Sequence, residues 1–131
     1  MTEKLEIYKC HICGNVVQVL LAGAGELVCC GKPMENLIPK YEEGNELAEK
    51  HVPSIEIEGD NKFVRLKYHP MIEEHYIQFI EVYSKDKSCL HLKYLNPNEL
   101  AEFDVSFMNK EFEALELCNI HGLWKGESGN D

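Results

Sequence analysis

From residue 54 onward, apolar and polar residues alternate in short runs. These runs are rich in Val, Ile, Phe, Tyr and Leu, and a period of two is typical of β-strands with one buried face. We predict strands in six stretches, which are SIEIEG, NKFVRLKY, EHYIQFIEVYS, KSCLHLKYLN, AEFDVSFM and EFEALELC. Turn sequences such as EGDN, SKDK and NPNE separate them at intervals of roughly 8–12 residues. This spacing is typical of an antiparallel sandwich or barrel.

Two stretches of this region also fit a helical period. NPNELAEF and NKEFEALEL place apolar residues three and four positions apart, so short helices are the alternative there. We favour strands in both places because the surrounding pattern has a period of two.

Residues 1–36 follow a different pattern of short strands and glycine-rich turns. EIYKC and VVQVLL are strand-like, while CHICGN and AGAGE are turns. About three dozen residues cannot bury enough apolar surface to fold alone, so we expect a metal ion to hold this module together. The following stretch, IPKYEEGNELAEK, is polar and has no sustained period, and we interpret it as a linker and lid-like loop.

Composition narrows the functional classes. The chain has 131 residues, of which 44% are hydrophobic, and a net charge of −10. Nucleic-acid binding needs a basic face, so we exclude it. No apolar run approaches the roughly 20 residues that span a bilayer, and MTEKLEIYKC does not resemble a signal peptide. Six cysteines without a secretion signal indicate reduced thiols and a cytoplasmic location.

Four of the cysteines have the spacing of a metal site. Cys10 and Cys13 form a C-x-x-C pair, and Cys29 and Cys30 follow as adjacent residues. Such a pair lets two thiolates reach one ion while backbone amides turn toward sulfur. Zinc and iron both accept four thiolates, so the spacing leaves a structural zinc ion and an iron centre as alternatives.

A second group of candidate ligands comes from histidines in distinctive contexts. His51 lies in EKHVP, His69 in YHPM and His75 in EEHYI, while Cys118 and His121 lie in CNIH after the last long strand. Loops at one end of a sandwich can converge on one point. Four imidazoles and one thiolate are one ligand more than structural zinc uses, and they suit ferrous iron with an open coordination position.

The remaining histidines and one cysteine fall outside both groups. His11 lies between two cysteines and is expected to face water, and His91 alternates with leucines in a strand. Cys89 is most simply a small buried or edge hydrophobic residue.

The motifs together resemble a known family. YKCHICGNVV and GELVCCGKPM closely resemble the desulforedoxin-like module, which binds one iron through four cysteines. With EKHVP, HPM…EEHYI and CNIHGLW in that order, nearly the whole chain resembles desulfoferrodoxin, the two-iron family of superoxide reductases. The resemblance implies a mostly β protein. We expect a desulforedoxin-like tetrathiolate module in residues 1–37. We expect an immunoglobulin- or fibronectin-like antiparallel β-sandwich with the catalytic iron in residues 38–131.

The resemblance also implies a role for each site residue. The first iron is bound by Cys10, Cys13, Cys29 and Cys30. The catalytic iron has His51, His69, His75 and His121 as equatorial ligands and Cys118 as the axial one. Glu49 is then the carboxylate that caps the sixth position in the oxidised enzyme, and Lys50 is the positive residue beside the open site.

The expected activity is one-electron reduction of superoxide to hydrogen peroxide without release of oxygen. The implied cofactors are two iron ions per chain, and the implied partners are superoxide, rubredoxin or a similar electron donor, and a second copy in a homodimer. Two other interpretations remain. One is a non-enzymatic two-iron electron carrier or redox sensor, and the other is a zinc-stabilised binding module whose histidines are incidental.

Overall fold

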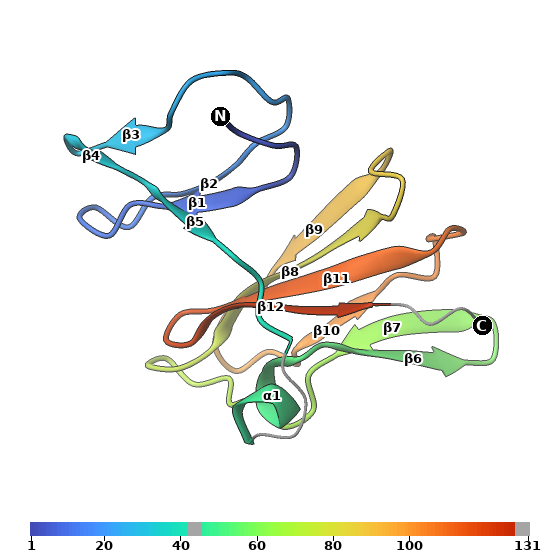
Figure 1. Ribbon diagram of the computed structural model, residues 1–131. Helices are drawn as coiled ribbons and strands as arrows, with labels where there is room; N and C mark the ends of the chain where they lie inside the picture. The colour runs from blue at the N-terminus through green and yellow to red at the C-terminus, as the bar shows by residue number, and fades with distance from the viewer. Residues whose placement is uncertain (42–45, 128–131) are drawn as a thin grey trace. The chain divides into compact units, whose positions relative to one another are not determined.

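The computed structural model of the protein describes residues 1–41 and 46–127 (Figure 1). It divides into two units, Met1–Ile38 and Pro39–Asp131. Strands dominate both units, as the alternation predicted. Residues 42–45, in the middle of the expected linker, lie outside the described residues. Within the described part, no helix is long and apolar enough to cross a membrane.

The first unit consists of two small antiparallel sheets. In one, β1 (Ile7–Lys9) lies between β2 (Val16–Gln18) and β5 (Glu35–Leu37), and in the other β3 (Val28–Cys29) pairs with β4 (Lys32–Pro33). The buried hydrophobic residues of this unit are Ile7, Cys10 and Val19. Such a core is small, so the unit depends on another source of stability, as expected for a metal-binding module.

The second unit is an antiparallel sandwich of two sheets. The first sheet has the order β10-β7-β6, and the second has the order β12-β11-β8-β9. Their bounds are β6 Ser54–Glu58, β7 Asn61–Arg65, β8 Ile77–Ser84, β9 Leu90–Tyr94, β10 Glu102–Asp104, β11 Phe112–Cys118 and β12 Gly122–Glu127. The predicted strands are therefore present, and the helical alternative for NPNELAEF and NKEFEALEL is wrong.

The core of the sandwich comes from the facing sides of both sheets. Val64 of β7 packs in one buried cluster with Ile80 and Val82 of β8 and with Phe112 and Ala114 of β11. These positions are two residues apart within β8 and β11, so the period of two places them on one face. The mostly β prediction with a sandwich as its main domain is confirmed.

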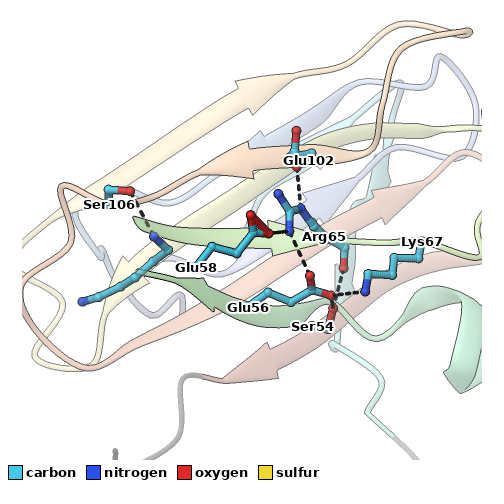
Figure 2. A network of polar contacts seen from close by, with 8 residues as sticks. Ser54, Glu56, Glu58, Arg65, Lys67, Glu102 and Ser106 are labelled. Atoms are coloured by element: carbon cyan, nitrogen blue, oxygen red, sulfur yellow. Dashed lines mark hydrogen bonds and ion pairs between the residues drawn. The ribbon is translucent and has the colours of Figure 1, made fainter. Parts of the chain in front are cut away.

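Charged residues cover the opposite face of the three-stranded sheet (Figure 2). Arg65 of β7 donates to Glu56 and Glu58 of β6 and to Glu102 of β10, and Lys67 pairs with Glu56 at 3.0 Å. The Arg65 guanidinium thus bridges all three strands. Exposed ion pairs contribute little singly, but one guanidinium shared by three carboxylates fixes the strands side by side.

Two elements were not predicted. The helix α1 (Glu46–His51) replaces part of the expected linker, and its six residues are too few to show a helical period. The strand β12 follows Cys118 and His121, in a stretch where we predicted no strand. It contains two glycines and two adjacent buried residues, Leu123 and Trp124, so its sequence does not alternate.

Candidate metal centres

The four N-terminal cysteines come together at the ends of their strands. Cys10 follows β1, Cys13 lies in the next turn, and Cys29 and Cys30 lie at the turn between β3 and β4. All four Sγ atoms lie within 4.8 Å of one another, and the thiols are free. The sulfurs of Cys13 and Cys29 are 3.5 Å apart.

Backbone conformation lets the adjacent cysteines point to the same place. Cys30 has a φ of 53° and Gly31 a φ of 75°, so the chain reverses in the left-handed region immediately after Cys29. Glycine adopts this region without strain, whereas cysteine does so at a cost. The turn therefore brings two neighbouring thiols to one side.

The electrostatics of this group favour a bound cation. Backbone amides of Cys13 and Ile12 lower the pKa of Cys10 to about 6, so one thiolate forms readily. Hydrogen bonds with the side chains of Cys13, Cys10 and Cys29 raise the pKa of Cys30 to about 12, so its protonated form is favoured. A bound metal ion replaces such protons and stabilises the thiolates, and four thiolates suit iron or zinc.

The second group gathers at one end of the sandwich. His51 ends α1, His69 follows β7, His75 precedes β8, Cys118 ends β11 and His121 lies in the turn before β12. Ligand atoms of His51, His69, His75 and Cys118 all lie within 4.8 Å of one another. Nε2 of His69 is 3.1 Å from Nε2 of His51 and 3.3 Å from Sγ of Cys118.

His121 lies beside this four-residue group. Its Nδ1 is 3.9 Å from Sγ of Cys118, and its ring centroid is 4.9 Å from that of His51 and 5.0 Å from that of His75. All five predicted residues of the second group are thus neighbours in the structure.

Hydrogen bonds orient two of the imidazoles. Nδ1 of His51 donates to the carbonyl oxygen of Leu47 at 2.7 Å, and Nδ1 of His69 donates to that of Pro70 at 2.6 Å. Each bond places the proton on Nδ1 and leaves the lone pair of Nε2 facing the group, as in metal-bound histidines.

The third imidazole gives the clearest test of whether an ion fits. Nε2 of His75 is buried and has no hydrogen-bond partner among the described residues. A buried polar atom without a partner is costly and rare in folded proteins. A metal ion among the converging nitrogens and sulfur satisfies it, so the donor set fits a metal.

Burial sets the protonation of the ligands. It lowers the pKa of His69 to about 4 and also lowers the pKa values of His51 and His75, so these imidazoles are neutral at pH 7. Burial raises the pKa of the Cys118 thiol, while the backbone amide of His121, 3.4 Å from Sγ, lowers it in part. Metal binding at Cys118 therefore releases a proton.

Several further residues shape this site. The ring of Trp124 stacks on His51 with centroids 4.9 Å apart, and its Nε1 donates to the carbonyl oxygen of His121 at 3.1 Å. Nζ of Lys40 donates to the same oxygen at 3.1 Å. We did not predict Lys40, because nothing in the linker sequence marks it. The sequence did show Trp124 directly behind the CNIH motif.

Glu49 and Lys50 are exposed in the last turn of α1, next to His51. Burial is the main cause of the lowered pKa of His75, with further effects from His121 and from the charge of Lys50, which places Lys50 within electrostatic reach of the site. His11, paired with Glu35, and His91, 4.2 Å from the Phe107 ring centroid, belong to neither group.

Comparison with known proteins gave consistent results. A model of the desulfoferrodoxin N-terminal domain matches residues 2–37, and a desulfoferrodoxin model matches residues 43–127. A desulfoferrodoxin homolog of Archaeoglobus fulgidus is 45% identical over 128 residues, covering 95% of this chain and 98% of that one. Another, of Methanothermobacter thermautotrophicus, is 46% identical over 130 residues, covering 95% and 99%. The crystal structure of the superoxide reductase from Treponema pallidum is similar with a TM-score of 0.70 and 25% identity, covering 96% and 99%.

Proposed function

Because the chain belongs to the desulfoferrodoxin family, we propose that it is a superoxide reductase, which converts superoxide to hydrogen peroxide. The balanced reaction takes one superoxide, one electron and two protons to one hydrogen peroxide, and no oxygen is released. The observation that carries this proposal is that the imidazoles of His51, His69 and His75 converge with the Cys118 thiol. His121 lies beside them, and Nε2 of His75 is buried without a hydrogen-bond partner among the described residues.

The group of four cysteines and the group of histidines with Cys118 suit the two iron ions of this family. We assign one iron to the four N-terminal thiols and the other to the four imidazoles and Cys118. Bound by these residues, ferrous iron would supply the single electron that superoxide takes up. Five protein ligands would leave room at such an ion for a small molecule, which is typical of a catalytic site.

Access to the second site is favoured on the side of the less buried ligands. His75 and His121 are half-buried, whereas His51 is fully buried under the ring of Trp124. The protein carries a net charge of −10, which repels superoxide at long range. We assign to Lys50 the attraction of the anion near the opening, because a local cation reverses the potential there. Glu49, its neighbour, is the proposed carboxylate cap of the oxidised state.

Cys118 is held so that its sulfur stays available to the metal. The amide of His121 points at Sγ, and His69 lies against it at 3.3 Å. An amide that donates to a thiolate stabilises its negative charge and moderates its electron donation. We propose that this balance favours release of the reduced product.

The electron donor is proposed to dock over exposed apolar residues that flank the ligands. Leu47, Tyr68, Ile72 and Ile120 are exposed, and each lies within four residues of a proposed ligand. Single exposed apolar residues are common, but four next to one metal site favour a transient protein contact. Rubredoxin, or a similar small redox protein, is the proposed donor.

We further propose a homodimer that uses the first unit. Val16, Val17, Leu20, Leu21 and Val28 are exposed there, although the unit buries few apolar residues of its own. Pairing two such surfaces removes them from water. All six cysteines are free thiols, which suits the proposed cytoplasmic location.

The test begins with the iron content and visible spectrum of the purified protein. Two irons per chain and visible colour are expected, whereas a zinc-binding module is colourless. The protein is then mixed with superoxide in the presence of a reductant, and peroxide and oxygen are measured together. Reduction gives one peroxide per superoxide and no oxygen. Oxygen release would mean dismutation, and no rapid reaction would mean an electron carrier or sensor.

A further inference from the structure

His75 is held differently from its neighbours in the second metal site. The rings of His51 and His69 are each fixed by a backbone carbonyl that accepts from Nδ1. In the part of the chain that the structure describes, no such bond to the ring of His75 is present, and its Nε2 is buried without a partner. The position of this imidazole is therefore set through its backbone, which exchanges two hydrogen bonds with that of Ile72 and is held further on both sides of His75.

The side chain of Asn119 contacts the backbone on both sides of His75. Its Oδ1 accepts from the amide of Tyr76 at 3.0 Å, and its Nδ2 donates to the carbonyl oxygen of Glu74 at 3.1 Å. The amide of Asn119 also donates to the carbonyl oxygen of Tyr76 at 3.2 Å. Three hydrogen bonds thus join Asn119 to the residues that flank His75.

These bonds continue the ladder between β8 and β11 past its regular end. The register of the two strands shifts between Leu117 and Cys118, and Cys118 is paired with Ile77. Beyond this irregularity, the side-chain amide of Asn119 supplies one donor and one acceptor, as a strand residue would. Only one orientation of the Asn119 amide satisfies both partners, so it specifies a single arrangement.

We propose that Asn119 is a positioning residue for His75, linking the segment before β8 that carries His75 to the turn after Cys118 that carries His121. The rings of His51 and His69 are oriented directly by carbonyl oxygens. Asn119 orients His75 indirectly, by holding the backbone on both sides of it. The inference rests on the proposed assignment of these residues as iron ligands. Loss of a group that orients a metal ligand costs about 10–100-fold in metal affinity, and we expect a loss in this range for Asn119→Ala.

The experiment measures iron retention in the full, iron-loaded protein. A ferrous chelator is titrated against the wild type and Asn119→Ala, the samples are then oxidised, and the iron left at the histidine site is read from its thiolate-to-ferric-iron charge-transfer absorption. The tetrathiolate iron is the internal reference and should be unaffected. Asn61→Ala is the matched control, because Asn61 accepts one side-chain hydrogen bond in the same unit at the start of β7, beside the end of β6. It should retain iron as the wild type does.

A double-mutant cycle tests whether Asn119 acts through His75. Asn119→Ala should cost little in a His75→Ala background and retain most of its cost in a His69→Ala background, because interacting residues are non-additive. Equal costs in both backgrounds, or unchanged iron retention in Asn119→Ala, would overturn the proposal. If Asn119→Ala does not fold, Asn119→Gln replaces it throughout. Its amide is one methylene too long, so it should weaken iron retention, and wild-type retention would overturn the proposal.

The same experiment separates this inference from the ligand assignment. If His75→Ala and His69→Ala retain iron as the wild type does, the assignment itself is wrong. If they lose iron while Asn119→Ala does not, only the role of Asn119 is wrong.

Discussion

Substituting Glu116 by Gln should change how the stability of the sandwich depends on pH. Glu116 lies in β11 on the same side as Phe112, Ala114 and Cys118 and has 0% exposure. Neither of its carboxyl oxygens has a hydrogen-bond partner among the described residues. Burial raises the pKa of this carboxyl well above its ordinary value of 4.5, because the charged form is poorly solvated there.

The sign and size of the effect follow from proton linkage. Above pH 4.5 the unfolded chain releases the proton of Glu116 while the folded protein keeps it, until the pH reaches the raised pKa. Stability therefore falls as the pH rises, by up to about 1.4 kcal/mol per pH unit. Glutamine is nearly the same size, is also polar and never ionises. From pH 5 to pH 7 the free energy of unfolding of wild type should fall relative to Glu116→Gln by up to about 2.7 kcal/mol.

The assay is urea unfolding of iron-free, reduced protein at pH 5, 6 and 7, followed by tryptophan emission. Trp124 is the only tryptophan and is buried in the sandwich, so the signal reports this unit. Buried histidines have lowered pKa values and make stability rise with pH, but they are common to both proteins and cancel in the difference. Parallel pH curves for the two proteins would refute the reasoning, since they would mean that Glu116 ionises in the folded state as easily as in water.

The remaining predictions concern the metal sites. Cys29→Ser should remove the tetrathiolate iron colour and leave superoxide reduction largely intact, and a loss of the fast superoxide reaction in the folded variant would contradict this separation. Cys118→Ser should keep some iron but lose the thiolate-to-iron absorption band and most activity, so an unchanged spectrum and rate would show that Cys118 is not a ligand. Lys50→Ala should slow the encounter with superoxide by about ten-fold and alter its salt dependence in stopped-flow measurements, whereas Glu49→Ala should change only the spectrum of the oxidised resting state. If Lys50→Ala and wild type react equally fast at every salt concentration, Lys50 does not attract superoxide, and the iron alone accounts for its capture.

Local sequence patterns predicted the sandwich because short runs rich in apolar residues are separated by turn sequences. β7, β8 and β11 each contribute to the shared core, and β8 and β11 are buried over most of their length. The pattern failed for α1 and β12, which are six residues each and have no alternation of apolar and polar residues. Their structure depends on tertiary contacts, such as the stacking of Trp124 on His51.

The candidate ligands were predicted from their residue types, since Cys and His side chains can bind metals wherever the fold places them. Residues that act through hydrogen bonds cannot be recognised from their type alone. Asn119 and Lys40 are ordinary polar residues in the sequence, and their partners lie 43 and 81 positions away. Glu116 lies within EFEALELC, where alternation alone does not distinguish a buried carboxyl from an exposed one. Only the register of β11 shows which side it faces.

The position of β11 between β8 and β12 has a consequence for the order of events during synthesis. The four N-terminal cysteines are complete by residue 30, so their unit has all its ligands while most of the chain is still to be translated. The second site needs Cys118, which ends β11 and is translated 88 residues after Cys30. Domains fold from the N-terminus during translation at about 5–20 residues per second. The first metal site can therefore be filled on the ribosome before the second site has all its ligands.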